Sequence, residues 1–236
     1  MHLARPHPAK PLPRYAFPAH DGPGEIPERI AAAARRAVGV EGVADVLAFE
    51  ISILVYGLAG WRFRPATESP RMTAYRECGW QTAAIGLGLV LLVETFPIHA
   101  LAARANPAFA WLLTGLSLYG LLWLFGDYQA LRLRPMRLTG DELWLRLGLR
   151  ASARIPLASI REARALRPGE AVRGRRDTLR AVLLGDATVA IELAEPVVAK
   201  GAYGVRRRVT RVELAPDDPR GFLAEIQASL ANATRN

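Results

Sequence analysis

Residues 79–131 decide the fold, and they read GWQTAAIGLGLVLLVETFPIHALAARANPAFAWLLTGLSLYGLLWLFGDYQAL. The only charged side chains in this stretch are those of Glu94, Arg104 and Asp127. If this stretch is drawn as helices, apolar residues occupy every face of them. A surface helix in a soluble domain has apolar residues on one face only. A bilayer's hydrocarbon layer is roughly 30 Å thick and needs about 20 helical residues. We therefore predict two transmembrane helices, residues 79–103 and 107–131, joined by a short loop.

A third apolar segment, residues 43–61, precedes this pair. Asp45 and Glu50 interrupt the segment, and Arg62 and Arg64 follow it directly. Its length is sufficient for a spanning helix, although its two acidic residues weaken the pattern. We predict that it crosses the membrane as well. The alternative is a helix that lies in the membrane interface.

The distribution of arginines predicts the orientation of these spans, because Lys and Arg accumulate in cytoplasmic loops. The loop of residues 62–76 carries four arginines and three more follow the last span closely, whereas the loop between the second and third spans holds only Arg104. We expect the first loop and the C-terminal domain to be cytoplasmic. Three crossings then place the N-terminus outside, and Arg35 and Arg36, which precede the first span, argue against that placement.

The two ends of the chain differ in composition. Residues 1–25 are rich in proline and lack an apolar core, which predicts a disordered tail and not a signal peptide. Residues 134–236 carry net charge +7 of the chain's total of +9. We therefore divide the chain into this tail, a membrane region at 26–133 that begins with a short helix, and a basic domain at 134–236. The single cysteine, Cys78, excludes an intrachain disulfide.

The basic domain shows the alternating pattern of β-strands. Leucines occupy every second position from 143 to 149, which indicates a strand with one buried face. A Gly-Asp pair at 185–186 predicts a tight hairpin between strands at 178–184 and 187–193. Further short apolar runs bring the expected number of strands to six or seven.

A helix is expected to close this domain. Asp218 and Pro219 form a typical helix start, with Asp as the cap and Pro in the first turn. Phe222, Ile226 and Leu230 follow at intervals of four residues, which places them on one face. The expected fold is a membrane region of three transmembrane helices and a C-terminal all-β barrel or sandwich, capped by one α-helix.

The run Arg134-Pro-Met-Arg-Leu-Thr-Gly-Asp-Glu-Leu-Trp-Leu-Arg-Leu-Gly-Leu-Arg150, followed by Ile155-Pro-Leu-Ala-Ser-Ile160, resembles the PH-like domains of small bacterial integral membrane proteins. Parts of residues 94–127 also resemble a membrane region found beside such domains. The resemblance covers about residues 45–230. It implies a seven-stranded PH-like barrel with a C-terminal helix. It implies no particular activity, because a fold does not fix a function.

Ionisable side chains within the apolar segments are the first group of candidate functional residues, because burying a charge in hydrocarbon costs at least ~2.5 kcal/mol. They are Glu50, Glu94, His99 and Asp127. Glu50, Glu94 and His99 could form a site for a proton, a metal or a small polar ligand between the first two spans. The alternative is a neutral Glu94 or hydrogen bonds between helices. Asp127 is close enough to the cytoplasmic interface to pair with an arginine.

Two clusters of arginines form the second group of candidates. They are Arg173, Arg175 and Arg176 in one loop, and Arg206, Arg207 and Arg208 in another. On a domain tethered to a bilayer, such residues can bind anionic lipid headgroups at about 1 kcal/mol each; the alternative is that they are simply solvated. No aromatic platform accompanies them, so we do not expect a nucleic-acid partner.

The sequence contains no P-loop, no nucleophile elbow, no zinc-protease motif and no dinucleotide fingerprint. We therefore expect no enzyme activity, no cofactor and no bound metal. The expected function is that of a scaffold or interaction module in the bacterial inner membrane, with lipids or another membrane protein as partners. A membrane enzyme or transport component, or a sensor of anionic lipids, are the alternatives.

We predict that Glu94→Gln leaves expression and thermal stability in detergent unchanged. A neutral carboxylic acid is far less costly in hydrocarbon than a carboxylate, and Gln is a neutral side chain of the same shape. The measurement is the melting temperature of the purified variant beside that of the wild type. A markedly lower melting temperature would mean that an ionised Glu94 is paired in the native protein.

Overall fold

The computed structural model describes residues 22–65, 70–171 and 174–233. Four helices come first in the chain, and they are α1 (Ile26–Val38), α2 (Glu41–Ala59), α3 (Trp80–Ala105) and α4 (Pro107–Leu133). The strands follow, and they are β1 (Arg137–Thr139), β2 (Glu142–Leu147), β3 (Ala151–Pro156), β4 (Ile160–Ala165), β5 (Thr178–Ala181), β6 (Val189–Gly201) and β7 (Arg206–Leu214). Helix α5 (Pro219–Ala233) ends the fold. Residues 1–21 of the predicted tail lie outside the described residues.

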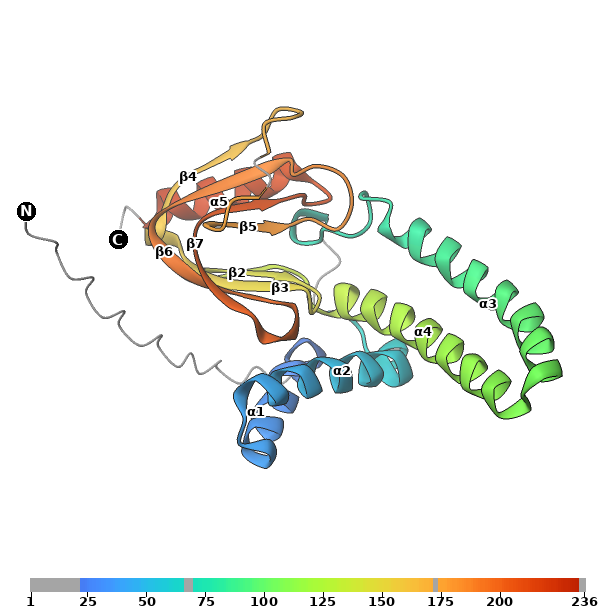
Figure 1. Cartoon of the computed structure of the whole chain (residues 1–236). Helices are drawn as coiled ribbons and strands as arrows, with labels where there is room; N and C mark the ends of the chain where they lie inside the picture. The colour runs from blue at the N-terminus through green and yellow to red at the C-terminus, as the bar shows by residue number, and fades with distance from the viewer. Residues whose placement is uncertain (1–21, 66–69, 172–173, 234–236) are drawn as a thin grey trace, which may run out of the picture.

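The three predicted apolar segments are confirmed as helices. Each is long and apolar enough to cross a membrane, by length and composition. Helices α3 and α4 form a hairpin that projects away from the sheet (Figure 1). Asn106 separates them, and its side-chain oxygen accepts hydrogen bonds from the backbone N–H groups of Ala108 and Phe109. With Pro107 in the first turn, this is a complete N-terminal cap for α4.

Helices α2 and α4 pack with their backbones in contact. A Cβ atom added to Gly126 would lie 2.3 Å from the carbonyl oxygen of Ile53, and one added to Gly57 would lie 2.8 Å from that of Leu122. No larger residue fits at either position, so the two glycines permit this close approach. By contrast, no described residue of α3 is buried, because α3 packs mainly against α4, although Trp80 at its start also packs against the core of the sheet.

The seven strands form one mixed sheet in the order β1-β2-β3-β6-β7-β5, with β4 also pairing with β6. All pairs are antiparallel except β5 with β7, which is parallel. The predicted hairpin around residues 185–186 is therefore wrong. Strand β5 has no access to β6, because β4 and β7 occupy both edges of β6 at residues 189–193. The structure has seven strands, in agreement with the expected six or seven, and the expected C-terminal helix is confirmed.

The core of the sheet includes residues from the loop between α2 and α3. Met72, Ala74 and Tyr75 belong to the same buried cluster as the inward-facing residues of the strands and of α5. The backbone N–H of Met136 donates to the carbonyl of Met72 at 2.8 Å. The predicted domain boundary at residue 134 therefore separates the sheet from part of its own core. This loop and the sheet necessarily lie on the same side of the α3–α4 hairpin.

Asp217 fastens this loop to the start of α5. One carboxylate oxygen accepts hydrogen bonds from the backbone N–H groups of Arg76 and Glu77, at 2.9 and 3.0 Å. The other accepts from the hydroxyl of Thr73 at 2.5 Å. The backbone N–H of Asp217 donates in turn to the carbonyl of Thr73. A single side chain thus satisfies three donors of the loop.

We predict that Asp217→Ala destabilises the protein by about 2–4 kcal/mol, because three donors lose a charged acceptor. Asp217→Asn keeps one carbonyl oxygen and should lose about half as much. The measurement is thermal or denaturant unfolding of the full chain in detergent. Equal stability of Asp217→Ala and the wild type would show that the loop contributes nothing to the fold of the sheet.

Candidate functional site

A cavity of about 370 Å³ lies between helices α1 and α2 and the end of the sheet formed by the β2–β3 turn and the β6–β7 turn. We call it the α1–α2 cavity. Its polar wall contains three acidic and four basic side chains: Glu25, Glu28, Asp45, Arg29, Arg35, Arg134 and Lys200. Figure 1 shows how α1 and α2 lie beneath this end of the sheet. The segments that meet here are far apart in the sequence.

Arg134 anchors one side of the cavity. It follows α4 directly, its side chain is only 4% exposed, and it forms a two-point ion pair with the Glu28 carboxylate at 2.6 and 3.0 Å. Burial raises the pKa of Glu28, but the charge and hydrogen bonds of Arg134, together with the charge of Arg146, outweigh burial, and the pKa is lowered. Burial likewise lowers the pKa of Arg134, but the combined effects of Glu28, Tyr56 and Glu25 outweigh burial, and the pKa is raised. Both groups are therefore held in their charged forms.

A second buried pair lies beside the first. Arg146 of β2 donates to the Glu25 carboxylate, and both side chains are at most 6% exposed. Burial, together with the nearby charge of Arg134, lowers the pKa of Arg146, and Glu25 opposes this shift. Tyr56 of α2 completes the contact with the N-terminal segment, because its hydroxyl donates to the carbonyl of Pro23 at 2.7 Å. Residues 23–28 are thereby fixed against α4 and β2.

Asp45 anchors the opposite side of the cavity. Its carboxylate is 2.6 Å from Arg35 of α1 and 3.8 Å from Lys200 of β6. Gly204 lies so close that an added Cβ atom would be 2.4 Å from the Asp45 side chain, and its φ of +79° also favours glycine. Burial lowers the pKa of Lys200, which Asp45 opposes and the charge of Arg35 reinforces. One carboxylate therefore serves two cations.

Two N–H donors of the wall have no acceptor. The Nε atoms of Arg35 and Arg134 are buried and make no hydrogen bond to any described residue. Buried donors of this kind are rare in native proteins, because leaving one unsatisfied costs about 1–3 kcal/mol. Neither Nε atom is open to the cavity, whose wall has an excess of one positive charge. This arrangement favours an anionic ligand.

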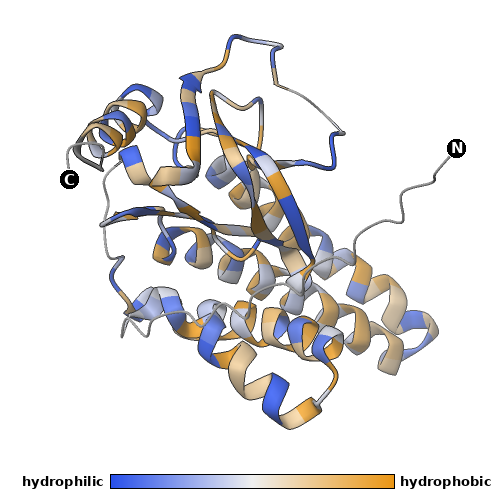
Figure 2. Ribbon diagram, turned by 90° about the vertical axis from the view of Figure 1, so that its left-hand side faces the viewer, coloured by the Kyte–Doolittle hydropathy of each residue, from blue (hydrophilic) through white to orange (hydrophobic). Residues whose placement is uncertain are grey.

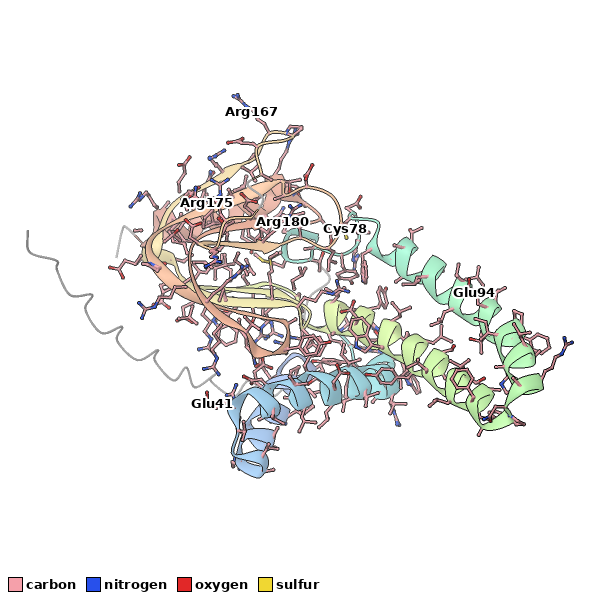
Figure 3. All side chains as sticks on the ribbon, in the orientation of Figure 1. Glu41, Cys78, Glu94, Arg167, Arg175 and Arg180 are labelled. Atoms are coloured by element: carbon pink, nitrogen blue, oxygen red, sulfur yellow. The ribbon has the colours of Figure 1, made fainter. Side chains whose placement is uncertain are left out.

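The structure does not bring Glu50, Glu94 and His99 together. The Glu50 carboxylate accepts a hydrogen bond from the Tyr119 hydroxyl of α4 at 2.6 Å. The His99 ring nitrogen Nδ1 is 2.7 Å from the Thr114 hydroxyl, also in α4. Glu94 is exposed on the side of α3 that faces away from α4 (Figure 3). Among the described residues, no group of three or more His, Cys, Asp or Glu side chains could hold a metal ion.

Asp127 pairs with an arginine, as the sequence allowed. It is completely buried and forms a two-point ion pair with Arg150 at 2.9 and 3.0 Å. Arg150 also lies over the ring of Trp80, 4.3 Å from its centroid. Arg150 follows β2 in the sequence, so this pair joins the turn after β2 to α4. Its role in the fold is structural.

The two predicted arginine clusters have different surroundings. Arg206, Arg207 and Arg208 begin β7 and are exposed next to the β6–β7 turn, close to the α1–α2 cavity. Arg175 is paired with Asp177 at 2.7 and 3.0 Å, and it lies in the part of the sheet away from α1 and α2 (Figure 3). Arg173 lies outside the described residues. The arginine loops therefore do not form one continuous site.

The residues of the α1–α2 cavity were missed at the sequence level. Arg146 occupies the outward-facing position of an alternating strand, which predicts exposure, and η1 (Pro23–Glu25) covers it instead. Lys200 offered one weak signal, because it is one of only two lysines among 31 basic residues. No local pattern links Glu28 with Arg134, which are 106 positions apart.

Comparison with family models, with curated proteins and with solved structures finds no match for this chain.

We predict that Glu28→Gln destabilises the protein by about 3–5 kcal/mol at neutral pH, because it leaves the buried Arg134 with no charged partner. The control Glu195→Gln, at an exposed position of β6, should change nothing. Both are measured by unfolding in detergent.

The same pair should give the protein an acid-dependent stability. A carboxyl group whose pKa is lowered by folding contributes stability above its ordinary pKa, and this stability is lost as the pH falls through the lowered value. We therefore predict that the melting temperature of the wild type falls below about pH 4, and that Glu28→Gln shows a weaker fall. Parallel pH profiles for the two proteins would contradict the assignment.

Proposed function

We propose that this chain is a non-enzymatic binding module anchored in the bacterial inner membrane, and that the α1–α2 cavity holds a phosphate or a similar anionic group. The observation that carries this proposal is the charge of the cavity wall, in which four basic side chains, Lys200 among them, face three acidic ones. An anion would neutralise this excess positive charge.

The chemistry of the wall suits an oxyanion. Guanidinium groups present several donors in a plane and pair well with phosphate and carboxylate oxygens. Lys200 adds a positive point charge. Burial lowers the pKa of Lys200, and a bound anion would favour the protonated form of its amine. A volume of about 370 Å³ falls within the range of small-molecule sites. Phe49 and Tyr203, with ring centroids 4.2 Å apart, supply an apolar wall beside the charged groups.

The membrane location rests on the three apolar helices. Figure 2 shows apolar residues along most of the helical half of the molecule, whereas the sheet and its loops mix hydrophilic and apolar residues. The first loop and the sheet lie on one side of the hairpin and contain most of the arginines, which supports a cytoplasmic sheet domain. Seven strands followed by a helix support a PH-like fold, although the parallel β5–β7 pair departs from an antiparallel barrel.

The alternative functions have less support. A transport or enzyme site formed by Glu50, Glu94 and His99 requires these side chains to meet, and they contact different partners or face away from them. A lipid sensor that uses both arginine loops requires free cations, and Arg175 is already paired with Asp177. Arg206, Arg207 and Arg208 are exposed next to the β6–β7 turn and add to the positive charge near the α1–α2 cavity.

The proposal is tested by measuring ligand binding to the full chain in an uncharged detergent. Inorganic phosphate and dihexanoyl phosphatidylglycerol are titrated separately, and affinity is measured by calorimetry and by the rise in melting temperature. Binding of inorganic phosphate would indicate a soluble anion as the ligand. Binding of the lipid alone would indicate a headgroup. The absence of binding by both probes would overturn the proposal.

Two variants locate the site. Lys200→Gln should weaken binding about tenfold, since one charged hydrogen bond is worth about 1.5–3 kcal/mol and 1.4 kcal/mol corresponds to tenfold. Asp45 keeps Arg35 as its partner in this variant, so the fold should be retained. Arg176→Gln removes the same charge from an exposed loop outside the cavity and should bind as the wild type. A loss confined to Arg176→Gln would place the site in the arginine loop.

A further inference from the structure

One face of α2 is apolar and exposed along its whole length. Its large exposed side chains are Val43, Val46, Leu47, Ile51 and Leu58. The opposite face is buried against α1, α4 and the β6–β7 turn. Between Val43 and Leu58 this face contains apolar side chains and one acidic residue, the half-exposed Glu50, whose carboxylate accepts a hydrogen bond from the Tyr119 hydroxyl of α4.

The N-terminal half of α2 is held by the sheet domain. Asp45 pairs with Lys200 at 3.8 Å, and the ring of Phe49 packs on that of Tyr203. These partners lie in and beside the β6–β7 turn. Glu41, at the first position of α2, lies beneath this end of the sheet (Figure 3).

The preceding helix α1 is held by the sheet domain as well. Glu28 of α1 pairs with Arg134, and Glu25 pairs with Arg146 of β2. Both pairs are buried at the junction of α4 and the sheet. The chain immediately before α2 is thereby fixed on the side of the sheet.

The C-terminal end of α2 lies on the same side. Gly60 packs against Gln129 near the end of α4, and Arg132 donates to the carbonyl of Phe63 at 3.3 Å. The loop that follows then enters the core of the sheet through Met72. Both ends of α2 are thus attached to the domain that follows α4.

A spanning α2 is incompatible with these attachments. A helix of 19 residues is about 28 Å long, so a crossing would place its two ends on opposite faces of the hydrocarbon layer. Because Asp45 and Phe49 contact the β6–β7 turn, that turn would have to cross the hydrocarbon layer together with the N-terminal end of α2. That turn has Lys200 before it and three exposed arginines after it, and each charge in hydrocarbon costs at least ~2.5 kcal/mol.

We propose that α2 lies parallel to the membrane surface, with its exposed apolar face inserted into the lipid interface, and that the chain crosses the membrane only twice, through α3 and α4. The partner of this surface is the lipid bilayer. The N-terminus then lies on the same side as the sheet. All arginine-rich segments, including Arg35 and Arg36, fall on one side, and Arg104 alone marks the other, as the positive-inside pattern requires.

The first test is the side on which cysteines react. In a Cys78→Ser background, Ala37→Cys in α1 and Ala105→Cys at the end of α3 are treated with a membrane-impermeant maleimide in intact and in permeabilised spheroplasts, beside the wild type with Cys78. We expect Ala37→Cys and Cys78 to react under the same condition and Ala105→Cys under the opposite one. If Ala37→Cys reacts together with Ala105→Cys, α2 spans the membrane and the proposal is overturned.

The second test is depth. Nitroxides are attached at Val43→Cys, Ile51→Cys and Leu58→Cys in the full chain in phosphatidylglycerol–phosphatidylcholine vesicles, and the ratio of collision rates with oxygen and with a nickel chelate is measured. An in-plane helix gives equal, shallow depths of about 5–10 Å. The control Leu116→Cys, exposed in the middle of α4, should be deeper. An Ile51→Cys label as deep as Leu116→Cys, with both flanking labels shallower, would overturn the proposal.

Discussion

The charge of Arg134 must be neutralised where α4 meets the sheet, and much of the structure depends on this requirement. The side chain is almost completely buried, and its ion-pair partner is Glu28. The partner comes from α1, so helix α1 is drawn against the junction and α2 follows it. The α1–α2 cavity is the space left between these helices and the sheet. A buried ion pair adds little net stability when it is complete, but a missing partner is costly, so the pair acts mainly by fixing one arrangement.

The helices could be predicted from the sequence because their signal is local. The uniformly apolar stretches define α3 and α4, and the Asp218–Pro219 start with apolar residues at every fourth position defines α5. The pairing of β5 could not be predicted in the same way. A Gly-Asp turn favours a local hairpin, but β4 and β7 already occupy the two edges of β6. Competition between distant strands for one edge leaves no trace in a local pattern.

The candidate site could not be predicted for a related reason. The pairs of Glu28 with Arg134 and of Glu25 with Arg146 join segments that are more than 100 positions apart, and no local pattern links their members. The intramembrane ionisable residues gave a stronger signal, since charge is rare in apolar segments, but that signal gives no information on which partners they meet. Glu50 and His99 each contact a hydroxyl group of α4, and Asp127 serves the fold. A strong local signal was therefore a poor guide to a site assembled by tertiary contacts.

The insertion of residues 72–75 into the core of the sheet has a consequence for biosynthesis. These residues leave the ribosome before α3, whereas the strands that cover them are made only after α4 is complete. Until then, Tyr75 and its neighbours have no core to join, and the acidic groups of α1 have no arginine partners. In the topology proposed above, insertion of the α3–α4 hairpin into the bilayer returns the chain to its starting side, which brings the two halves of the core within reach. In that topology, membrane insertion is a folding step for the sheet domain as well, and a chain whose hairpin fails to insert would expose two incomplete surfaces prone to aggregation.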